Sequence, residues 1–209
     1  MTSYFAHFMS YMGHGSRARY WALALVSPKM SRPLFFLDFY VYPLIILLCL
    51  GVAALSTPAT LIVERFMFGV LVWTFAEYLL HRFVLHAWPY FVEIHLAHHA
   101  DAQEMIGTPT LFSVLFFYGG IYLPLWWLLG SSIALPSFAG FISGYLAFAG
   151  VHYLVHHSTS TNKLMRNWKK LHAIHHHSKA GNNYGVLTDF WDRVFGTYSP
   201  TIIRHNDLK

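Results

Sequence analysis

The sequence predicts an all-α integral membrane protein with four transmembrane helices, and three observations lead to that fold class. Of its 209 residues, 56% are hydrophobic and only 11% are charged. Soluble domains carry about 25% charged residues, so this chain has too few ionic groups to cover a soluble surface. The mean hydropathy is +0.41. Four apolar runs are close to the length of roughly 20 residues that a bilayer-spanning helix needs.

Each apolar run gives the approximate bounds of one expected span. The third run contains Pro124, which we expect to kink its helix. The second run is short, so its helix is expected to continue beyond the hydrocarbon. The four expected spans are about Tyr40–Leu55, Phe66–Leu80, Leu111–Gly130 and Ile133–Val155.

Lysine and arginine gather on one side of this layout. Only Arg65 falls on the other side, in the expected turn Ser56–Arg65, and the turn after the third span has none. Because basic residues favour the cytoplasmic side, both termini and the segment 81–110 are expected to be cytoplasmic. We expect a single membrane-embedded domain over residues 1–209, in a bacterial inner membrane or the endoplasmic reticulum.

Charge and cysteine usage exclude several other classes. The formal net charge of +5 in so apolar a chain favours a membrane surface rather than nucleic acid as the partner. The single cysteine, Cys49, excludes an intrachain disulfide framework and a cysteine metal cluster. Residues 1–34 lack the features of a signal peptide. The stretch Tyr4–Leu25 fits either an interfacial helix or an unstructured tail.

Fifteen histidines are present, and twelve of them fall in the windows 81–99 and 152–177. Residues i, i+3 and i+4 of an α-helix share one face. The histidines of the second box therefore point one way, as do those of the last box, and a third pair lies one turn apart at the end of the fourth span. These groups are His95, His98 and His99; His172, His175 and His176; and His152 with His156.

His81 and His86 are five residues apart, which a straight α-helix does not place on one face. This pair needs a helix end or a bulge between its members. In the four-span layout, every histidine group lies at or beyond the same end of a span. All four groups are therefore expected to converge on one cytoplasmic cap.

Ten histidines in these groups are the predicted metal ligands. Neutral imidazole is a common protein ligand that suits zinc, copper, iron and nickel. Ten are too many for one ion, so they indicate a dinuclear site with four or five rings per ion. His157, His177 and the scattered His7, His14 and His205 are expected to be non-ligands. The predicted ligands are His81, His86, His95, His98, His99, His152, His156, His172, His175 and His176.

The order H-x4-H, H-x2-H-H, H-x3-H, H-x2-H-H resembles that of the fatty acid hydroxylase superfamily, which also holds sterol desaturases and, more distantly, carotenoid hydroxylases. The resemblance runs from about Ser31 to Tyr198. Within the superfamily, the chain looks most like the fatty acyl 2-hydroxylases of sphingolipid metabolism. The segments that carry this closer likeness are Gly107–Phe112, His156–Ser158, Lys163–Lys170, Tyr184–Val186 and Trp191–Thr197.

The resemblance implies a four-helix transmembrane bundle with a cytosolic metal cap, in which the same ten histidines hold two iron ions. Zinc is a possible occupant of a purified sample. The implied activity is hydroxylation of a C–H bond in a lipid acyl chain, with O₂ as co-substrate and no catalytic side chain beyond the ligands. Two alternatives stay open. One is a sterol desaturase-type enzyme or a carotenoid or other lipid hydroxylase, and the other is a membrane metal transporter, which would need ligands at mid-span.

Electrons are expected from a separate cytochrome b5-like or ferredoxin-like donor. Eukaryotic fatty acyl 2-hydroxylases often carry a fused cytochrome b5 domain, but this sequence contains no His-Pro-Gly-Gly haem motif. It also contains no G-x-G-x-x-G dinucleotide loop. The expected partners are therefore a membrane, a lipid substrate and a separate redox protein.

A few carboxylates and aromatics are candidates for supporting roles. Among the acidic residues near the boxes (Asp101, Glu104, Asp189 and Asp192), Asp189 is the first choice for orienting an imidazole, and Glu104 is expected to be a loop charge. Glu77 lies in an apolar span one turn before His81, so it is expected to have a partner or a function. Candidate residues for lining a substrate channel are Tyr145, Phe148, Trp126 and Trp127, although bundle packing or a place at the interface explains each singly.

Overall fold

The computed structural model describes residues 29–178 and 181–202, and the regular elements in these ranges are helices. The predictions for residues 1–28 lie outside the described residues. They are the lack of a signal peptide and the choice between an interfacial helix and an unstructured tail for Tyr4–Leu25. His7, His14 and His205 also lie outside them.

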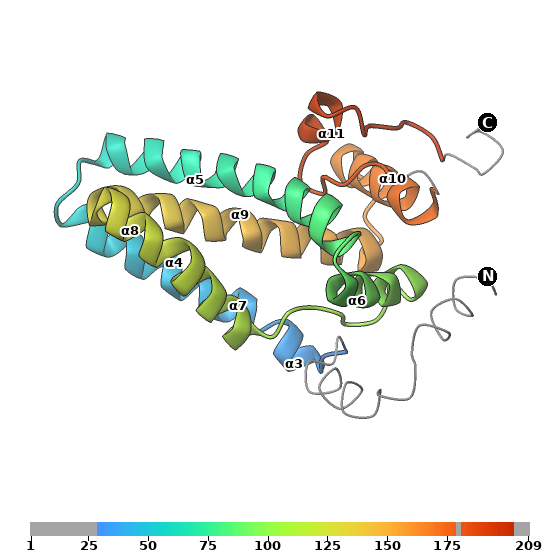
Figure 1. Cartoon of the computed structure of the whole chain (residues 1–209), viewed down its shortest axis with the longest axis horizontal. Helices are drawn as coiled ribbons and strands as arrows, with labels where there is room; N and C mark the ends of the chain where they lie inside the picture. The colour runs from blue at the N-terminus through green and yellow to red at the C-terminus, as the bar shows by residue number, and fades with distance from the viewer. Residues whose placement is uncertain (1–28, 179–180, 203–209) are drawn as a thin grey trace.

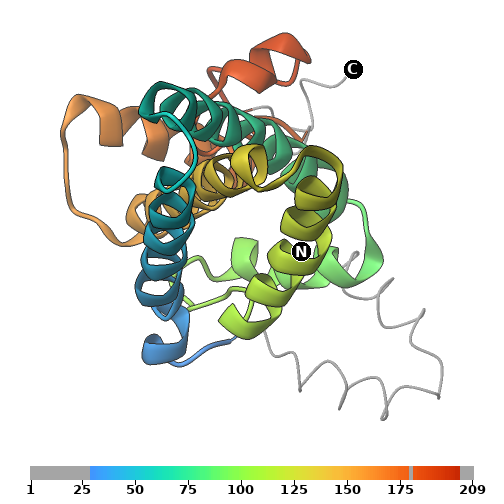
Figure 2. The same cartoon turned by 90° about the vertical axis from the view of Figure 1, so that its left-hand side faces the viewer.

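Four helical segments are long and apolar enough to cross a membrane, which confirms the four predicted spans. The first consists of the short helix α3 (Arg32–Phe35) and α4 (Asp38–Ala54), and the second is α5 (Ala59–Leu79) extended by the π-helical turn η1 (Leu80–Leu85). The third consists of α7 (Thr110–Phe117), the π-helical turn η2 (Tyr118–Tyr122) and α8 (Leu123–Leu129), and the fourth is α9 (Ser131–His157). Figure 2 shows these segments nearly end-on, grouped as a bundle.

The second span differs from the sequence expectation in its start, and the third contains a departure from α-helical geometry. The second span begins at Ala59 rather than Phe66, so Arg65 lies inside α5 and not in a turn. Its guanidinium donates to the Ser132 carbonyl oxygen at 2.8 Å, next to the loop that joins α8 to α9. The third span departs from α-helical geometry immediately before Pro124, because a π-helical turn accommodates the missing proline N–H.

Helix α9 is the centre of the bundle, since it packs closely against α5. A Cβ atom on Gly69 of α5 would lie 2.0 Å from the Ser137 carbonyl oxygen, and one on Gly140 would lie 1.9 Å from the Phe66 carbonyl oxygen. One turn further along α9, a Cβ on Gly144 would lie 2.6 Å from Trp73 Cβ. Small residues four positions apart are the usual means by which membrane helices approach closely.

The surface of the bundle is apolar, as a bilayer requires. Leu44, Phe68, Leu111 and Trp127 are among the exposed large hydrophobic side chains, and Trp127 is 80% exposed. Inside the bundle, aromatic side chains of different helices pack together, including Trp73 and Phe141 with ring centroids 5.1 Å apart. Such outward-facing apolar surface would be unfavourable in water, so the chain is a multi-pass membrane protein.

Three further helices lie beyond or beside one end of the bundle. They are α6 (Pro89–Ala100), α10 (Lys163–His177) and α11 (Phe190–Val194). Figure 1 shows all three on the right, while the α4–α5 loop and α8 lie at the opposite end. We call the end with α6, α10 and α11 the histidine end, because the histidine boxes meet there. That this end faces the cytoplasm stays a prediction from the distribution of basic residues.

Candidate metal centre

The first histidine pair is brought together by the π-helical turn at the end of α5. A π-helix bonds residues five apart, and η1 contains five of the six positions from His81 to His86. The two imidazole rings are stacked with centroids 5.3 Å apart and an interplanar angle of 27°. The predicted bulge is therefore present, and it gives a five-residue spacing a shared face.

Four histidines from three different segments form the first group, which we call the four-histidine set. One ligand atom from each lies within 4.8 Å of the others. His95 Nε2 lies 3.0 Å from His81 Nε2 and 3.0 Å from His86 Nε2. His86 Nε2 lies 3.2 Å from His175 Nε2 of α10. The set consists of His81, His86, His95 and His175.

Five histidines form a second group, the five-histidine set, whose ligand atoms also lie within 4.8 Å of one another. His172 Nε2 lies 2.9 Å from His156 Nε2 and 3.0 Å from His176 Nε2. His152 stacks on Phe148, with ring centroids 5.6 Å apart. Helices α6, α9 and α10 all contribute to this set, which consists of His98, His152, His156, His172 and His176.

His99 lies where the two sets adjoin. Its Nε2 is 3.0 Å from His95 Nε2 in one set, and its ring stacks on His176 of the other with centroids 4.1 Å apart. All ten predicted ligands are thus in one place. His177 is exposed, and His157 has both ring nitrogens near backbone carbonyl oxygens, so neither belongs to a set.

Backbone carbonyl oxygens fix the orientation of two rings in the four-histidine set. His81 Nδ1 lies 2.5 Å from the Tyr184 oxygen, and His175 Nδ1 lies 2.8 Å from the Asn182 oxygen. Because a carbonyl only accepts, each Nδ1 carries the proton and donates it. The Nε2 atom of each ring is therefore left with a lone pair that faces the other imidazoles.

The loop that supplies these carbonyls, residues 181–188, is held by two buried carboxylates. Asp192 Oδ1 accepts from Tyr184 N and its Oδ2 accepts from Gly185 N, both at 2.8 Å. Glu77 Oε1 of α5 accepts from Val186 N at 2.5 Å and from Leu187 N at 3.1 Å. The prediction that Glu77 has a partner is confirmed, and its partner is this loop.

The choice of Asp189 as the carboxylate that orients an imidazole is wrong. Asp189 instead pairs with Arg193 on the surface, with Oδ2 2.7 Å from Nη2. Asp192 accepts from the loop backbone, and the Tyr184 and Asn182 carbonyls of that loop reach the rings of His81 and His175. Glu104 forms a surface ion pair with Lys29 at 2.8 Å, which agrees with its expected place as a loop charge, and Asp101 accepts from the backbone N–H of Gln103.

Burial keeps the imidazoles neutral. It lowers the pKa of His98 from 6.5 to about 3 and that of His99 to about 4, and repulsion from neighbouring imidazoles adds to the effect. The pKa of His175 falls to about 3 for the same first reason, although the hydrogen bond to Asn182 opposes the change. Burial likewise lowers the pKa of His95 and His172. Neutral imidazole is the form that binds metal.

The two sets fit metal ions on their donor chemistry. Each brings four or five neutral nitrogen donors within 4.8 Å of one another. In addition, His98 Nε2 is buried with no hydrogen-bond partner among the described residues. Lone pairs that converge without donors between them are unfavourable unless a cation lies among them.

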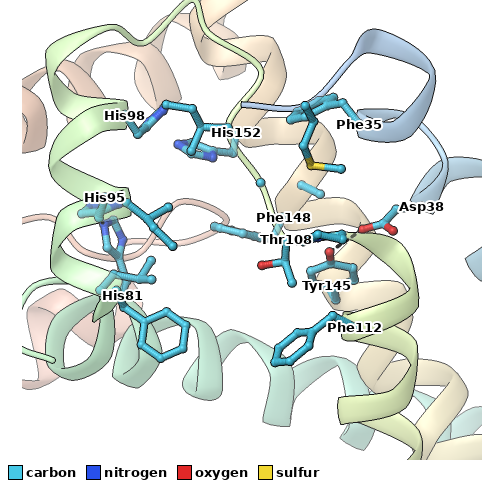
Figure 3. Close-up of a pocket in the computed structure, with 18 of the residues that line it drawn as sticks. Phe35, Asp38, His81, His95, His98, Thr108, Phe112, Tyr145, Phe148 and His152 are labelled. Carbon is cyan, nitrogen blue, oxygen red and sulfur yellow. Dashed lines mark hydrogen bonds between the residues drawn. The ribbon is translucent and has the colours of Figure 1, made fainter. Parts of the chain in front are cut away.

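A cavity of about 830 Å³ opens beside the histidines. His81, His95, His98 and His152 line one end of it, and Figure 3 shows these rings facing Phe112 and Tyr145 across the cavity. Most of the wall is apolar, including Phe35, Phe39, Phe112 and Phe148. Of the four candidates for lining a channel, Tyr145 and Phe148 line this cavity, whereas Trp126 and Trp127 are exposed on the outside of α8.

The sequence model of the fatty acid hydroxylase family matches residues 66–197, which include all ten predicted ligands. The chain belongs to the fatty acid hydroxylase family. The resemblance noted in the sequence is therefore confirmed, and the matched region contains all of the histidine boxes.

Named relatives within the family are lipid hydroxylases. The chain is 32% identical over 185 residues to the ceramide very long chain fatty acid hydroxylase of Schizosaccharomyces pombe, covering 80% of this chain and 53% of the relative. It is 33% identical to a dihydroceramide fatty acyl 2-hydroxylase of Arabidopsis thaliana, over 67% of this chain and 62% of the relative. It is 29% identical to the fatty acid 2-hydroxylase of Rattus norvegicus, over 70% and 42%. The chain thus spans about half the length of the curated relatives it matches.

A solved structure has the same architecture. The structure of full-length scs7p, in which only the hydroxylase domain is visible, superimposes with a TM-score of 0.73 at 29% sequence identity. The match covers 84% of this chain and 70% of that one. The chain therefore shares its overall fold with that hydroxylase domain.

Proposed function

We propose that this protein is a membrane oxygenase that hydroxylates a C–H bond of a lipid acyl chain, in the manner of a fatty acyl 2-hydroxylase. The observation that carries the proposal is the position of the two histidine sets at one end of a largely apolar cavity. Relatives named as ceramide or fatty acid hydroxylases support the same reaction class.

The proposal assigns all ten histidines as ligands of two iron ions. Imidazole accepts both zinc and iron, but Zn²⁺ has no redox chemistry, and oxidation of an unactivated C–H bond needs a redox metal. When bound, the iron pair supplies the activation of O₂ and the oxidation of the acyl chain. Zinc in a purified sample would then be an inactive occupant.

The residues of the chain itself have three tasks. The carbonyls of Asn182 and Tyr184 hold two rings with Nε2 towards the site. The aromatic wall, including Phe112 and Phe148, binds the acyl chain and excludes water from the reacting carbon. Burial keeps the ligand imidazoles neutral, so that no proton has to leave before metal binds.

Hydroxylation with O₂ places one oxygen atom in the product and reduces the other to water, which consumes two electrons and two protons. We propose that a separate redox protein delivers the electrons at the histidine end. The exposed cationic face of α10, with Lys163, Arg166 and Lys170, supports docking of an acidic donor there. Lys169 differs, since its Nζ donates to the carbonyl oxygens of Ser158 and Ser160.

A metal transporter fits the structure less well. Transport across a bilayer needs polar ligands near mid-span. Both histidine sets lie together at one end of the bundle instead, at the ends of α5 and α9 and on α6 and α10.

The proposal is tested by lipid mass spectrometry of one host that expresses the wild-type chain or the His98→Ala variant, with iron and an added electron-donor system. We expect lipids with one added oxygen atom in an acyl chain for the wild type and none for the variant. Isotopically labelled O₂ should place its label in the product. A lost hydrogen pair would instead indicate the desaturase-type alternative, and lipids that match the variant's would contradict the proposal.

A further inference from the structure

The cavity has a second polar end, away from the histidines. There Tyr145 of α9 donates its hydroxyl hydrogen to Asp38 Oδ2 at 2.5 Å, as Figure 3 shows. Asp38 is the first residue of α4, is only 6% exposed and lines the cavity. Its other oxygen, Oδ1, is buried and has no hydrogen-bond partner among the described residues.

An unused oxygen on a residue that lines the cavity distinguishes Asp38 from the carboxylates that hold the loop after α10. Asp192 uses both carboxylate oxygens to hold the loop after α10. Glu77 also leaves one oxygen without a partner, but Glu77 does not line the cavity. A buried polar atom without a partner is unfavourable, so a carboxylate oxygen at the wall of a cavity indicates that a ligand completes its hydrogen bonding.

The Asp38 end is separate from the histidine end. Tyr145 precedes His152 by seven residues on α9, which corresponds to about 10 Å along the helix axis. Between these ends, Phe148, which lies between Tyr145 and His152 on α9 and stacks on His152, forms part of the wall. A lipid in this cavity therefore meets imidazoles at one end and a hydrogen-bond acceptor at the other.

The charges that line the cavity restrict which ligand group reaches Asp38. The charged side chains among the lining residues are Asp38 and Glu93, and neither lysine nor arginine is among them in the described part of the chain. A free carboxylate or a phosphate would be repelled there. A hydroxyl or an amide N–H would be attracted, because the Tyr145 hydroxyl already donates to Asp38 Oδ2 and Oδ1 is left as an acceptor without a partner among the described residues.

We propose that Asp38, positioned by Tyr145, is a specificity-determining residue that accepts a hydrogen bond from a hydroxyl or N–H group of the lipid. The assignment rests on the proposed function, since it takes the cavity to be the lipid site. It selects uncharged lipids with a free donor over lipids that lack one and over free fatty acids. The surface carboxylate Glu64, which is exposed on α5, has no part in this selection.

The test compares lipid binding by the full-length, metal-loaded protein in detergent without O₂, so that no turnover occurs. The probes are an N-acylated amino alcohol, its fully N- and O-methylated derivative with the same acyl chain, and the free fatty acid. Dissociation constants are measured for the wild type, Asp38→Leu, Asp38→Asn and the control Glu64→Gln. Retained metal content and elution volume report whether each variant folds.

We expect the wild type and Glu64→Gln to prefer the donor lipid over its methylated derivative by about tenfold. Asp38→Leu should lose that preference. In Asp38→Asn the amide oxygen keeps the Tyr145 bond and an N–H₂ group replaces Oδ1, so the preference should vanish or reverse. This nearly isosteric variant decides the matter if the leucine variant does not fold.

An unchanged preference in folded Asp38→Asn, or no preference in the wild type, would overturn the assignment. A chain that shows the preference but forms no hydroxylated lipid contradicts the proposed function and leaves the assignment of Asp38 standing. Hydroxylation without the preference overturns the assignment alone.

Discussion

The two histidine sets are built from the same residue type but are supported in different ways. In the four-histidine set, His81 and His175 donate to the Tyr184 and Asn182 carbonyls of the loop after α10. In the five-histidine set, His172 Nδ1 is buried without a hydrogen-bond partner among the described residues, and His152 is held by stacking on Phe148. One set thus depends on a loop, whereas the other depends on helix packing.

The difference shows that clustered imidazole rings in a membrane bundle can be positioned without carboxylates hydrogen-bonded to them. The spans themselves fix the rings that α9 contributes. The ring of His81 after α5 and the ring of His175 on α10 are held in addition by hydrogen bonds to the loop 181–188, which we call the brace. Asp192 and Glu77 stabilise that loop from two sides.

The largest expected effect is the loss of a ligand from either set. His175→Ala should abolish metal binding at the four-histidine set and His98→Ala at the five-histidine set, because each removes a nitrogen donor from a closed group. Bound iron per chain should fall by about one ion in each variant, and turnover should fall to background in both. Metal analysis and product mass spectrometry measure these outcomes.

A variant at the exposed His177, which belongs to neither set, is the matched control and should keep metal and activity. Retained turnover in both ligand variants would remove the assignment of the sets.

The second prediction tests the brace. Asp192→Asn weakens the acceptors for Tyr184 N and Gly185 N, so the carbonyl that orients His81 should lose its position. Removing such support typically reduces metal affinity about 10- to 100-fold. We expect this loss for one of the two bound ions only, measured by competition with a chelator.

Asp189→Asn is the control for the brace, because Asp189 pairs with Arg193 on the surface. Equal weakening of both ions in Asp192→Asn would show that the two sets are not supported separately.

The third prediction is that acidic pH lowers the stability of the folded protein through both histidine sets alike. Burial lowers the pKa of His175 and of His98 from 6.5 to about 3, one in each set. Above pH 6.5 both are neutral in the folded and the unfolded chain. Below pH 6.5, the unfolded chain binds protons that the folded chain does not. The free energy of unfolding therefore decreases as the pH is lowered, by about 2 kcal/mol per group at pH 5.

Thermal unfolding of the metal-free protein in detergent between pH 7.5 and 5 measures this effect (buffers of matched ionic strength). A midpoint that is constant or rises towards pH 5 would contradict the buried, neutral state of the rings.

The smallest effect on stability and metal binding is expected for a hydrogen bond that reaches a histidine's backbone and not its imidazole ring. Gln103 Nε2 donates to the His156 carbonyl oxygen at 2.9 Å on the exposed side of the five-histidine set. Gln103→Ala should reduce stability by about 1 kcal/mol and leave metal affinity unchanged. A reduced affinity for one ion would mean that the five-histidine set also has a loop brace.

Much of this architecture is predictable from the sequence because it depends on periodicity. Apolar length gives the spans, and the spacing of three and four residues places His95, His98 and His99 on one helix face. The spacing of five residues between His81 and His86 correctly requires a bulge, which the structure provides as a π-helical turn.

The division of the boxes between the sets could not be predicted in this way. His95 and His98 share a helix face but join different sets, as do His172 and His175. That division depends on how α6 and α10 cross, which the sequence pattern does not specify. The groups that accept hydrogen bonds from the His81 and His175 rings are backbone carbonyls. Because every residue has a carbonyl, no side-chain pattern marks these acceptors, and the prediction of a carboxylate at Asp189 was wrong. The position of Asp38 at the cavity also depends on packing between α4 and α9.

We propose that the ten imidazoles hold two iron ions. Anaerobic Fe(II) titration of the full-length protein in detergent tests this assignment, with bound iron counted and its ligands identified by X-ray absorption. We predict about two ions per chain with a nitrogen-dominated ligand shell. Only trace iron, a single ion, or a shell dominated by oxygen or sulfur would contradict the account.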